Sequence, residues 1–169
     1  LDYRFDASAG GRSGQVRLQR LLRNGYCETG ARVANAAESF LSSGGWYVPG
    51  MDGQGLLLEF NPSQPTLFGA WFTHAPSGIA PGLRWYSLQA PNVTAMQTRF
   101  DAVPIYANTG GRFDAPGAPT LTKVGSADLV LSSCTAIQLS YRFTSGELAG
   151  RSGVQRLQRL GPPPAECVD

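Results

Sequence analysis

One sequence pattern occurs twice, close to the two ends of the chain, and it constrains the fold more than any other feature. The first copy reads LDYRF at residues 1–5 and GRSGQVRLQRL at residues 11–21. The second copy reads LSYRF at residues 139–143 and GRSGVQRLQRL at residues 150–160. The segment between the two blocks differs by one residue, as a change in a turn would give. Chance does not explain this match, so we interpret it as an internal repeat.

Each copy has the pattern of a β-hairpin. In the second copy, apolar Leu139, Tyr141 and Phe143 alternate with polar residues, which is the period of a strand with one apolar face. Residues 144–147 give a turn signal, and residues 154–160 return as a second strand. Residues 1–27, which repeat 139–167, are therefore expected to form an N-terminal hairpin. Its candidate assembly positions are Tyr3, Phe5, Val16, Leu18 and Leu21.

An isolated hairpin is only marginally stable in water, so the N-terminal copy must pack on something. Three arrangements are open. The hairpin could be the tail of a preceding unit in a tandem array, it could pack on its own domain, or it could complete a neighbouring subunit by strand addition or domain swapping. The sequence begins without methionine, which fits either processing or a cut in a longer repeat protein.

The rest of the chain predicts one all-β domain over residues 45–169. Charged residues make up only 15% of the sequence, which contains 21 glycines and 12 prolines, and this composition favours turn-rich β structure. Short apolar runs separated by turn signals predict about eight antiparallel strands in a meander, as a small barrel or a sandwich. Residues 28–44 are rich in alanine and predict a linker or a short helix before the domain.

The three cysteines follow the repeat. Cys134 precedes the second hairpin and Cys167 follows it, so a disulfide between them would tie down the C-terminal tail. Cys27 is the repeat equivalent of Cys167, and its own partner would lie before residue 1. Cys27 therefore fits a chain cut from an array or a thiol paired between subunits, and the alternative is a free buried cysteine.

Motifs for catalysis or metal binding are weak. His74 is the only histidine, and nothing in the sequence supplies the orienting partner of a catalytic triad. One histidine and three scattered cysteines lack the ligand spacing of a zinc site. Glu59 with Asp101 or Asp114 could form a glycosidase-like pair, but no motif singles it out. We therefore predict a non-enzymatic protein without a cofactor or metal.

Charge and hydropathy exclude two further classes. The net charge is only +2, and no recognised nucleic-acid-binding module is present, so we expect no nucleic acid partner. The sequence also lacks an apolar run of about 18 residues, so no membrane-spanning helix is predicted.

Aromatic residues come as adjacent pairs in three predicted strands. Neighbours in a strand point to opposite faces, so one of each pair is expected in the core and the other on the second face. If the second faces line up, they form a strip suited to a glycan, an apolar ligand or another subunit. In a closed barrel, one set fills the interior. The candidate ligand-facing residues are Trp46, Trp71, Trp85 and Tyr86.

Two further motifs carry a family resemblance. The first runs from GWYVP at residues 45–49 through GQG at 53–55 and Leu58-Glu59, and the second from VPIY at 103–106 through GGRF at 110–113. Together they resemble a β-domain of secreted proteobacterial proteins, and the resemblance covers residues 45–167. It implies a secreted or cell-surface bacterial protein and no established activity. The Gly-Trp-Tyr start before a meander is also similar in topology to avidin-like and lipocalin-like barrels.

These observations lead to one principal expectation and one alternative. The principal expectation is a structural domain that self-assembles, as a repeat unit or subunit of a surface filament or array, joined to its own kind through the N-terminal hairpin. The alternative is a binding module with a barrel cavity lined by Trp46, Trp71 and Trp85, for a glycan or a small apolar ligand.

Overall fold

The computed structural model describes residues 1–19, 43–61, 64–94, 97–112, 115–163 and 167. All regular elements among these residues are β-strands, apart from one short 3₁₀ helix. The prediction of an all-β chain is therefore confirmed. Within this part of the chain, the structure contains no helix with the length and apolarity that crossing a membrane requires. The expected linker or helix at residues 28–44 lies outside the described residues, apart from its last two positions.

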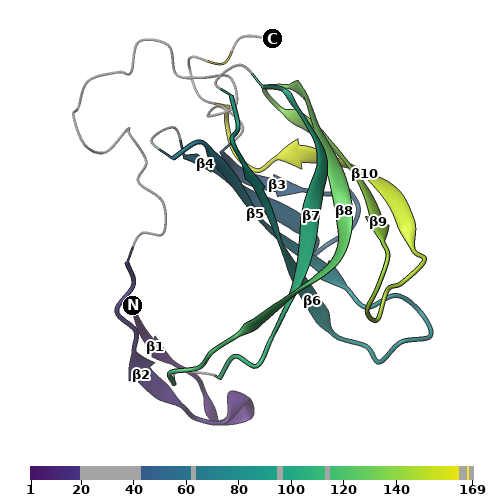
Figure 1. Ribbon diagram of the computed structural model, residues 1–169. Helices are drawn as coiled ribbons and strands as arrows, with labels where there is room; N and C mark the ends of the chain where they lie inside the picture. The colour runs from purple at the N-terminus through teal and green to yellow at the C-terminus, as the bar shows by residue number, and fades with distance from the viewer. Residues whose placement is uncertain (20–42, 62–63, 95–96, 113–114, 164–166, 168–169) are drawn as a thin grey trace.

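Eight strands form a closed antiparallel barrel, which decides between the barrel and the sandwich (Figure 1). Each strand pairs with the next one along the chain, as the predicted meander requires, and the last strand closes on the first. The strands of the barrel are β3 (Gly44–Tyr47), β4 (Gly55–Asn61), β5 (Thr66–His74), β6 (Leu83–Pro91), β7 (Arg99–Thr109), β8 (Thr120–Ser133), β9 (Ala136–Phe143) and β10 (Ser152–Arg159).

The core of the barrel follows largely from the alternation of buried and outward-facing side chains, which is clearest on β5. On β5, Leu67, Trp71 and Thr73 are buried while Phe72 between them is exposed, because successive side chains of a strand point to opposite faces. Aromatic rings from three strands meet inside. The centroid of the Trp71 ring lies 5.8 Å from that of Tyr86 and 5.9 Å from that of Phe143.

Irregularities in β7 and β8 position the turn between β9 and β10. The register of β7 and β8 shifts at Val124, which is bulged out of the ladder. The Val124 carbonyl accepts hydrogen bonds from the backbone N–H groups of Thr144 (2.8 Å) and Ser145 (3.2 Å). A bulge of this kind frees a backbone group and bends the strand. Here the freed carbonyl holds the start of the β9–β10 turn.

A disulfide and an arginine lie at the opposite end of the barrel. Cys134, in the turn between β8 and β9, forms a disulfide with Cys167, with a Cα–Cα distance of 5.8 Å. This confirms the predicted disulfide. Arg159 lies at the same end and stacks its guanidinium carbon 4.2 Å from the centroid of the Trp46 ring. Its Nε donates to the Cys134 carbonyl at 2.7 Å and its Nη1 to the Ser43 carbonyl at 3.0 Å.

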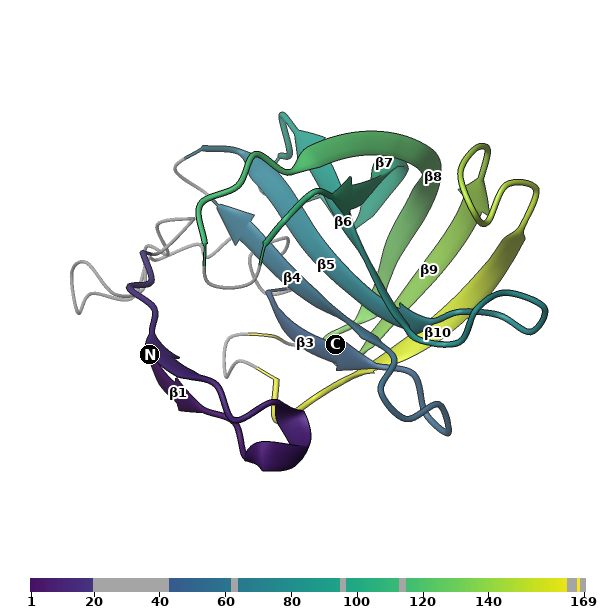
Figure 2. The ribbon, with the colours of Figure 1, turned by 90° about the horizontal axis from the view of Figure 1, so that it is seen from below.

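The N-terminal hairpin forms a two-stranded sheet separate from the sheet of the barrel (Figures 1 and 2). It consists of β1 (Asp2–Arg4) and β2 (Ser13–Gln15), joined by a turn that contains the 3₁₀ helix η1 (Ala7–Ala9). Asp6 caps this helix, and its carboxylate accepts from the Ala9 N–H at 3.1 Å. The predicted hairpin is thus present, but none of residues 1–19 is buried.

Candidate functional site

The N-terminal hairpin and the β9–β10 hairpin share one pairing register. Tyr3 lies opposite Gly14 in the first hairpin, and Tyr141 lies opposite Gly153 in the second. The flanking pairs also correspond, because Arg4 faces Ser13 as Arg142 faces Ser152. A one-residue slip would move every side chain to the other face of the hairpin. The two hairpins therefore present equivalent residues on equivalent faces.

The hydrogen bonds that close the two turns also correspond. The N–H of Phe5 donates to the Arg12 carbonyl at 2.7 Å, and the N–H of Phe143 donates to the Arg151 carbonyl at 2.8 Å. The turn itself differs, since residues 6–10 stand where the second copy has residues 144–149. The repeat thus extends from sequence to backbone structure, with one change in the turn.

The two copies differ sharply in burial. Leu1 is 72% exposed and its equivalent Leu139 is 0% exposed, while Phe5 is 42% exposed and its equivalent Phe143 is 2% exposed. In β9–β10 this face lines the inside of the barrel. The N-terminal hairpin therefore presents to solvent a face that its second copy buries in a core. The sequence-predicted set omitted Leu1, although its match to Leu139 in the repeat was the signal that could have added it.

The energy available on this face is considerable. Leu1 and Leu18 are both more than two-thirds exposed, and full burial of a leucine side chain stabilises by roughly 1.5–3 kcal/mol. A lone two-stranded hairpin is marginal in water. Covering this face would therefore favour both binding and hairpin formation. Of the other predicted assembly positions, Tyr3 and Val16 are partly buried, and Leu21 lies outside the described residues, as does Cys27.

The aromatic candidates divide between the two faces of the barrel wall. Trp46, Trp71 and Tyr86 are buried inside, with at most 6% of each side chain exposed, whereas Trp85 is 49% exposed on the outside. One member of each adjacent pair is thus core, as predicted. The three tryptophans Trp46, Trp71 and Trp85 do not line one cavity, because Trp46 and Trp71 are buried in the packed core whereas Trp85 is exposed and borders a cavity at one end of the barrel.

A row of exposed aromatic residues crosses the outside of β3 to β6. Tyr47 lies opposite Gly55, Gly55 opposite Phe72, and Phe72 opposite Trp85. The three aromatic side chains are 39–49% exposed. The Tyr47 hydroxyl donates to Oε1 of Gln158 at 3.0 Å, which fixes one end of the row. The sequence predicts such a strip, and the register of β3 to β6 selects Tyr47, Phe72 and Trp85 as its members.

A cavity of about 490 Å³ opens at the end of the barrel that carries the β9–β10 turn. It exists because β6 and β7 pair only from Tyr86 to Leu88 on the β6 side and then separate. Its apolar lining includes Tyr86, Phe143 and Leu148. Burial is the main cause that raises the pKa of Tyr86, so its hydroxyl stays neutral and can donate or accept a hydrogen bond.

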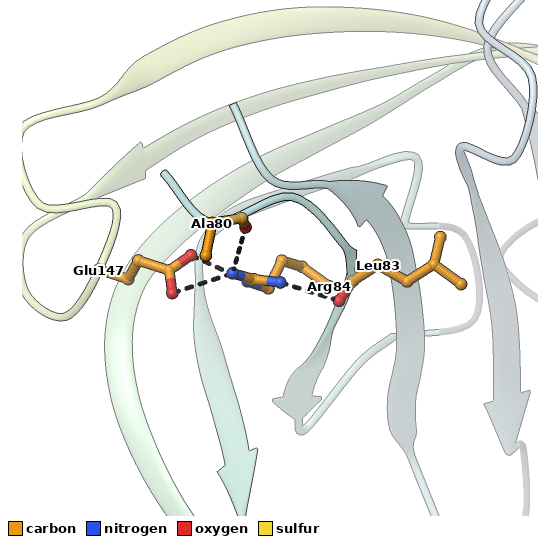
Figure 3. Close-up of polar contacts among 4 residues, drawn as sticks. All are labelled: Ala80, Leu83, Arg84 and Glu147. Atoms are coloured by element: carbon orange, nitrogen blue, oxygen red, sulfur yellow. Dashed lines mark hydrogen bonds and ion pairs between the residues drawn. The ribbon is translucent and has the colours of Figure 1, made fainter. Parts of the chain in front are cut away.

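An ion pair forms one side of this cavity (Figure 3). Nε of Arg84 lies 2.8 Å from Oε1 of Glu147, and Nη2 lies 3.2 Å from Oε2. Arg84 also donates to the carbonyls of Leu83 and Ala80. The hydrogen bond to Glu147 is the main cause that raises the pKa of Arg84. The pair therefore ties the β9–β10 turn to the start of β6, and it leaves a mostly apolar recess beside it.

The structure does not bring the catalytic candidates together. Nε2 of His74 lies 3.2 Å from the Asp52 carbonyl oxygen in the β3–β4 loop. Asp101 forms an exposed ion pair with Arg99 at 2.7 Å, and Glu59 is on β4, which does not neighbour β7. Asp114 lies outside the described residues. Within the described ranges, no group of three or more His, Cys, Asp or Glu side chains is placed to hold a metal ion.

Comparisons with protein-family models, with curated proteins and with solved structures found no match to this chain. The resemblance to the secreted proteobacterial β-domain therefore stays a sequence-based prediction.

Proposed function

We propose that this chain is a non-enzymatic structural module of an extracellular assembly, and that its N-terminal hairpin joins its barrel to a neighbouring unit. One observation carries this proposal. Residues 1–18 repeat a hairpin that packs into a barrel core, and yet Leu1 and Leu18 are exposed. Apolar side chains on one face of a strand pair favour pairing with another protein surface.

The Cys134–Cys167 disulfide supports the extracellular part of the proposal. Disulfides form and persist in oxidising compartments and are rare in the cytosol of mesophiles.

The molar mass of the full chain in solution tests the proposal. We expect light scattering to show a mass above that of one 18.0 kDa chain, increasing with protein concentration. Leu1→Ser and Leu18→Ser should each shift the equilibrium toward the monomer, about tenfold or more in the dissociation constant for each leucine that the contact buries.

Leu83 provides the matched control. It is 72% exposed, as Leu1 is, but it lies on the outside of the barrel at the start of β6. Leu83→Ser should leave the mass distribution unchanged. A wild-type chain that is monomeric at every concentration, or an oligomer that responds equally to Leu83→Ser and Leu18→Ser, would rule out assembly through the hairpin.

A second candidate function is favoured by the aligned row of Tyr47, Phe72 and Trp85. Exposed aromatic rings in line on the outside of a barrel wall can stack on successive sugar rings of a glycan, since sugar rings present an apolar face. Binding would quench the fluorescence of Trp85, the most exposed of the three tryptophans. Trp85→Ala should abolish retention on an insoluble polysaccharide, while Leu121→Ala, also exposed, should not.

A further inference from the structure

We infer that the surface which receives the N-terminal hairpin is a second barrel of the same kind, in which the hairpin takes the place of β9–β10, between β8 and β3. This inference rests on the proposed function and names the partner. The barrel of residues 44–159 is already closed by its own β9–β10. The place that fits the hairpin is therefore occupied within its own unit, and a second copy offers it when its own β9–β10 is displaced, as in an exchange of equivalent elements between subunits.

The apolar face of the hairpin fits the interior that β9–β10 fills. Leu139, Phe143 and Leu157 are at most 2% exposed in the barrel, and the repeat places leucine, phenylalanine and leucine at the same three positions of the hairpin. The rings also correspond, because Tyr3 and Phe5 have centroids 5.6 Å apart and Tyr141 and Phe143 have centroids 5.8 Å apart. The hairpin thus carries a preformed copy of this part of the core.

The place between β8 and β3 that would receive the hairpin, the seat, has two defined strand edges. In the barrel, Tyr141 on β9 pairs with Ala127 on β8, and Gln158 on β10 pairs with Tyr47 on β3. The seated hairpin would place Tyr3 opposite the residue equivalent to Ala127, and Gln19 opposite the residue equivalent to Tyr47. Backbone hydrogen bonds on both edges would then complete a closed sheet, which removes exposed strand edges altogether.

One difference between the copies improves the fit. Gln155 on β10 has a buried Oε1 atom with no hydrogen-bond partner among the described residues. The N-terminal copy has Val16 at this position. A buried polar atom without a partner is costly, whereas valine at the same place has no polar group to satisfy.

Two other differences between the copies would weaken the fit of the hairpin in a second barrel. Ser140 lies opposite Asp128 of β8, and the hairpin has Asp2 at the position of Ser140, so two carboxylates would meet. Like charges directly opposite each other destabilise a strand pair. The shorter turn of the hairpin also lacks a carboxylate equivalent to Glu147, which pairs with Arg84. In a second copy of this chain, the inserted hairpin would therefore place Asp2 opposite Asp128 and lose the ion pair of Arg84, and both effects weaken the contact without removing its apolar part.

A grafted full-length chain tests the seat. Residues 139–158 are replaced by residues 1–19, so that the N-terminal hairpin sequence must close the barrel, and Asp128→Ser removes the charge conflict. We expect a cooperative thermal transition and a near-ultraviolet circular dichroism spectrum like that of the wild type. The grafted chain holds this leucine twice, once at its N-terminal position and once in the barrel at the position of Leu157. Leu18→Ser in the barrel copy should lower the transition midpoint by roughly 10 °C, as for any core leucine in a domain of this size. The same substitution in the N-terminal copy should not change the midpoint.

A single substitution keeps the inference testable if the graft does not fold. Gln155→Val in the wild-type chain introduces the hairpin residue alone, and we expect an unchanged or higher transition midpoint. A lower midpoint for Gln155→Val, or a folded graft that is insensitive to its own Leu18→Ser, overturns the seat. If either result comes with oligomers that still dissociate on Leu18→Ser, the assembly role stands and only the partner is wrong. A graft that behaves as expected in a chain that is always monomeric supports the seat and refutes self-assembly.

Discussion

Leu18 and Leu157 hold the same position in two copies of one hairpin, but Leu18 is 71% exposed and Leu157 is 1% exposed. The difference lies in what surrounds them. Leu157 projects into the interior of a closed barrel, and Leu18 follows β2, the second strand of a separate two-stranded sheet. The same side chain is therefore a core residue in one copy and an exposed apolar residue in the other.

This relationship gives the first prediction. Leu157→Ala should lower the free energy of unfolding of the barrel by about 2–5 kcal/mol, because it removes buried methyl groups and leaves a cavity. Leu18→Ala should change it by no more than about 0.5 kcal/mol, as for most surface substitutions. Urea denaturation of both variants, at protein concentrations where the chain is monomeric, measures the difference. Equal losses would mean that the hairpin packs on its own barrel.

The Tyr141–Gly153 pair gives a second prediction. A Cβ atom on Gly153 would come within 2.6 Å of Oη and 2.8 Å of Cζ of Tyr141, so the Tyr141 ring would have to move. Gly153→Ala should therefore destabilise the barrel by about 1–3 kcal/mol, the usual cost of overpacking. Gly111→Ala is the control, because a Cβ there meets no atom of the described residues within 4 Å. Similar unfolding midpoints in urea for the two variants would contradict this view of the pair.

Arg159 gives a third prediction. Its planar guanidinium stacks on Trp46 and donates to two backbone carbonyls, while burial lowers its pKa. Lysine keeps the charge but offers neither the flat face nor the fixed pair of donors. Arg159→Lys should therefore cost about 1–3 kcal/mol of stability, the range for hydrogen bonds to a charged group. Arg156→Lys, at an exposed position of the same strand, should cost much less, and chemical denaturation of both variants decides.

Asp6 gives a fourth prediction, for the turn of the N-terminal hairpin. The hydrogen bond from Ser8 is the main cause that lowers the pKa of Asp6 below its ordinary value of 3.8, and the N–H of Ala9 adds to it. A depressed pKa stabilises the turn above the unfolded value, and this stabilisation is lost as pH falls through the folded value. Nuclear magnetic resonance titration should show Asp6 protonating below pH 3.8, together with loss of the turn signals of Ala7–Ala9. Asp6→Asn should remove this pH dependence.

Much of the fold could be predicted from the sequence because it depends on local patterns. The repeat identified both hairpins, the alternation along each strand identified the β class, and the position of Cys134 and Cys167 around the second hairpin identified the disulfide. Each of these signals is carried by residues close together in the chain or by a direct match between two segments. They required no knowledge of how distant strands pair.

The faces of the aromatic pairs show where sequence reasoning stops. On β5 the first residue of the pair, Trp71, faces inward, and on β6 the second, Tyr86, faces inward. The register explains this, since Trp71 lies opposite Tyr86 and Phe72 opposite Trp85. Alternation alone gives two equally good phases for each strand, and only pairing with a neighbour selects one. The outer row of Tyr47, Phe72 and Trp85 is therefore defined by the pairing of the strands in the barrel.

The disulfide between Cys134 and Cys167 has a mechanical consequence. The two cysteines are 33 residues apart in sequence, and the strands between them are β9 and β10. When the chain is pulled by its two ends, tension along the covalent chain passes from Cys167 directly to Cys134 and bypasses the backbone of the hairpin between them. About 115 Å of extended chain, at roughly 3.5 Å for each residue, is held in reserve in this way. Reduction of this one bond would release that length and let the chain extend further under tension.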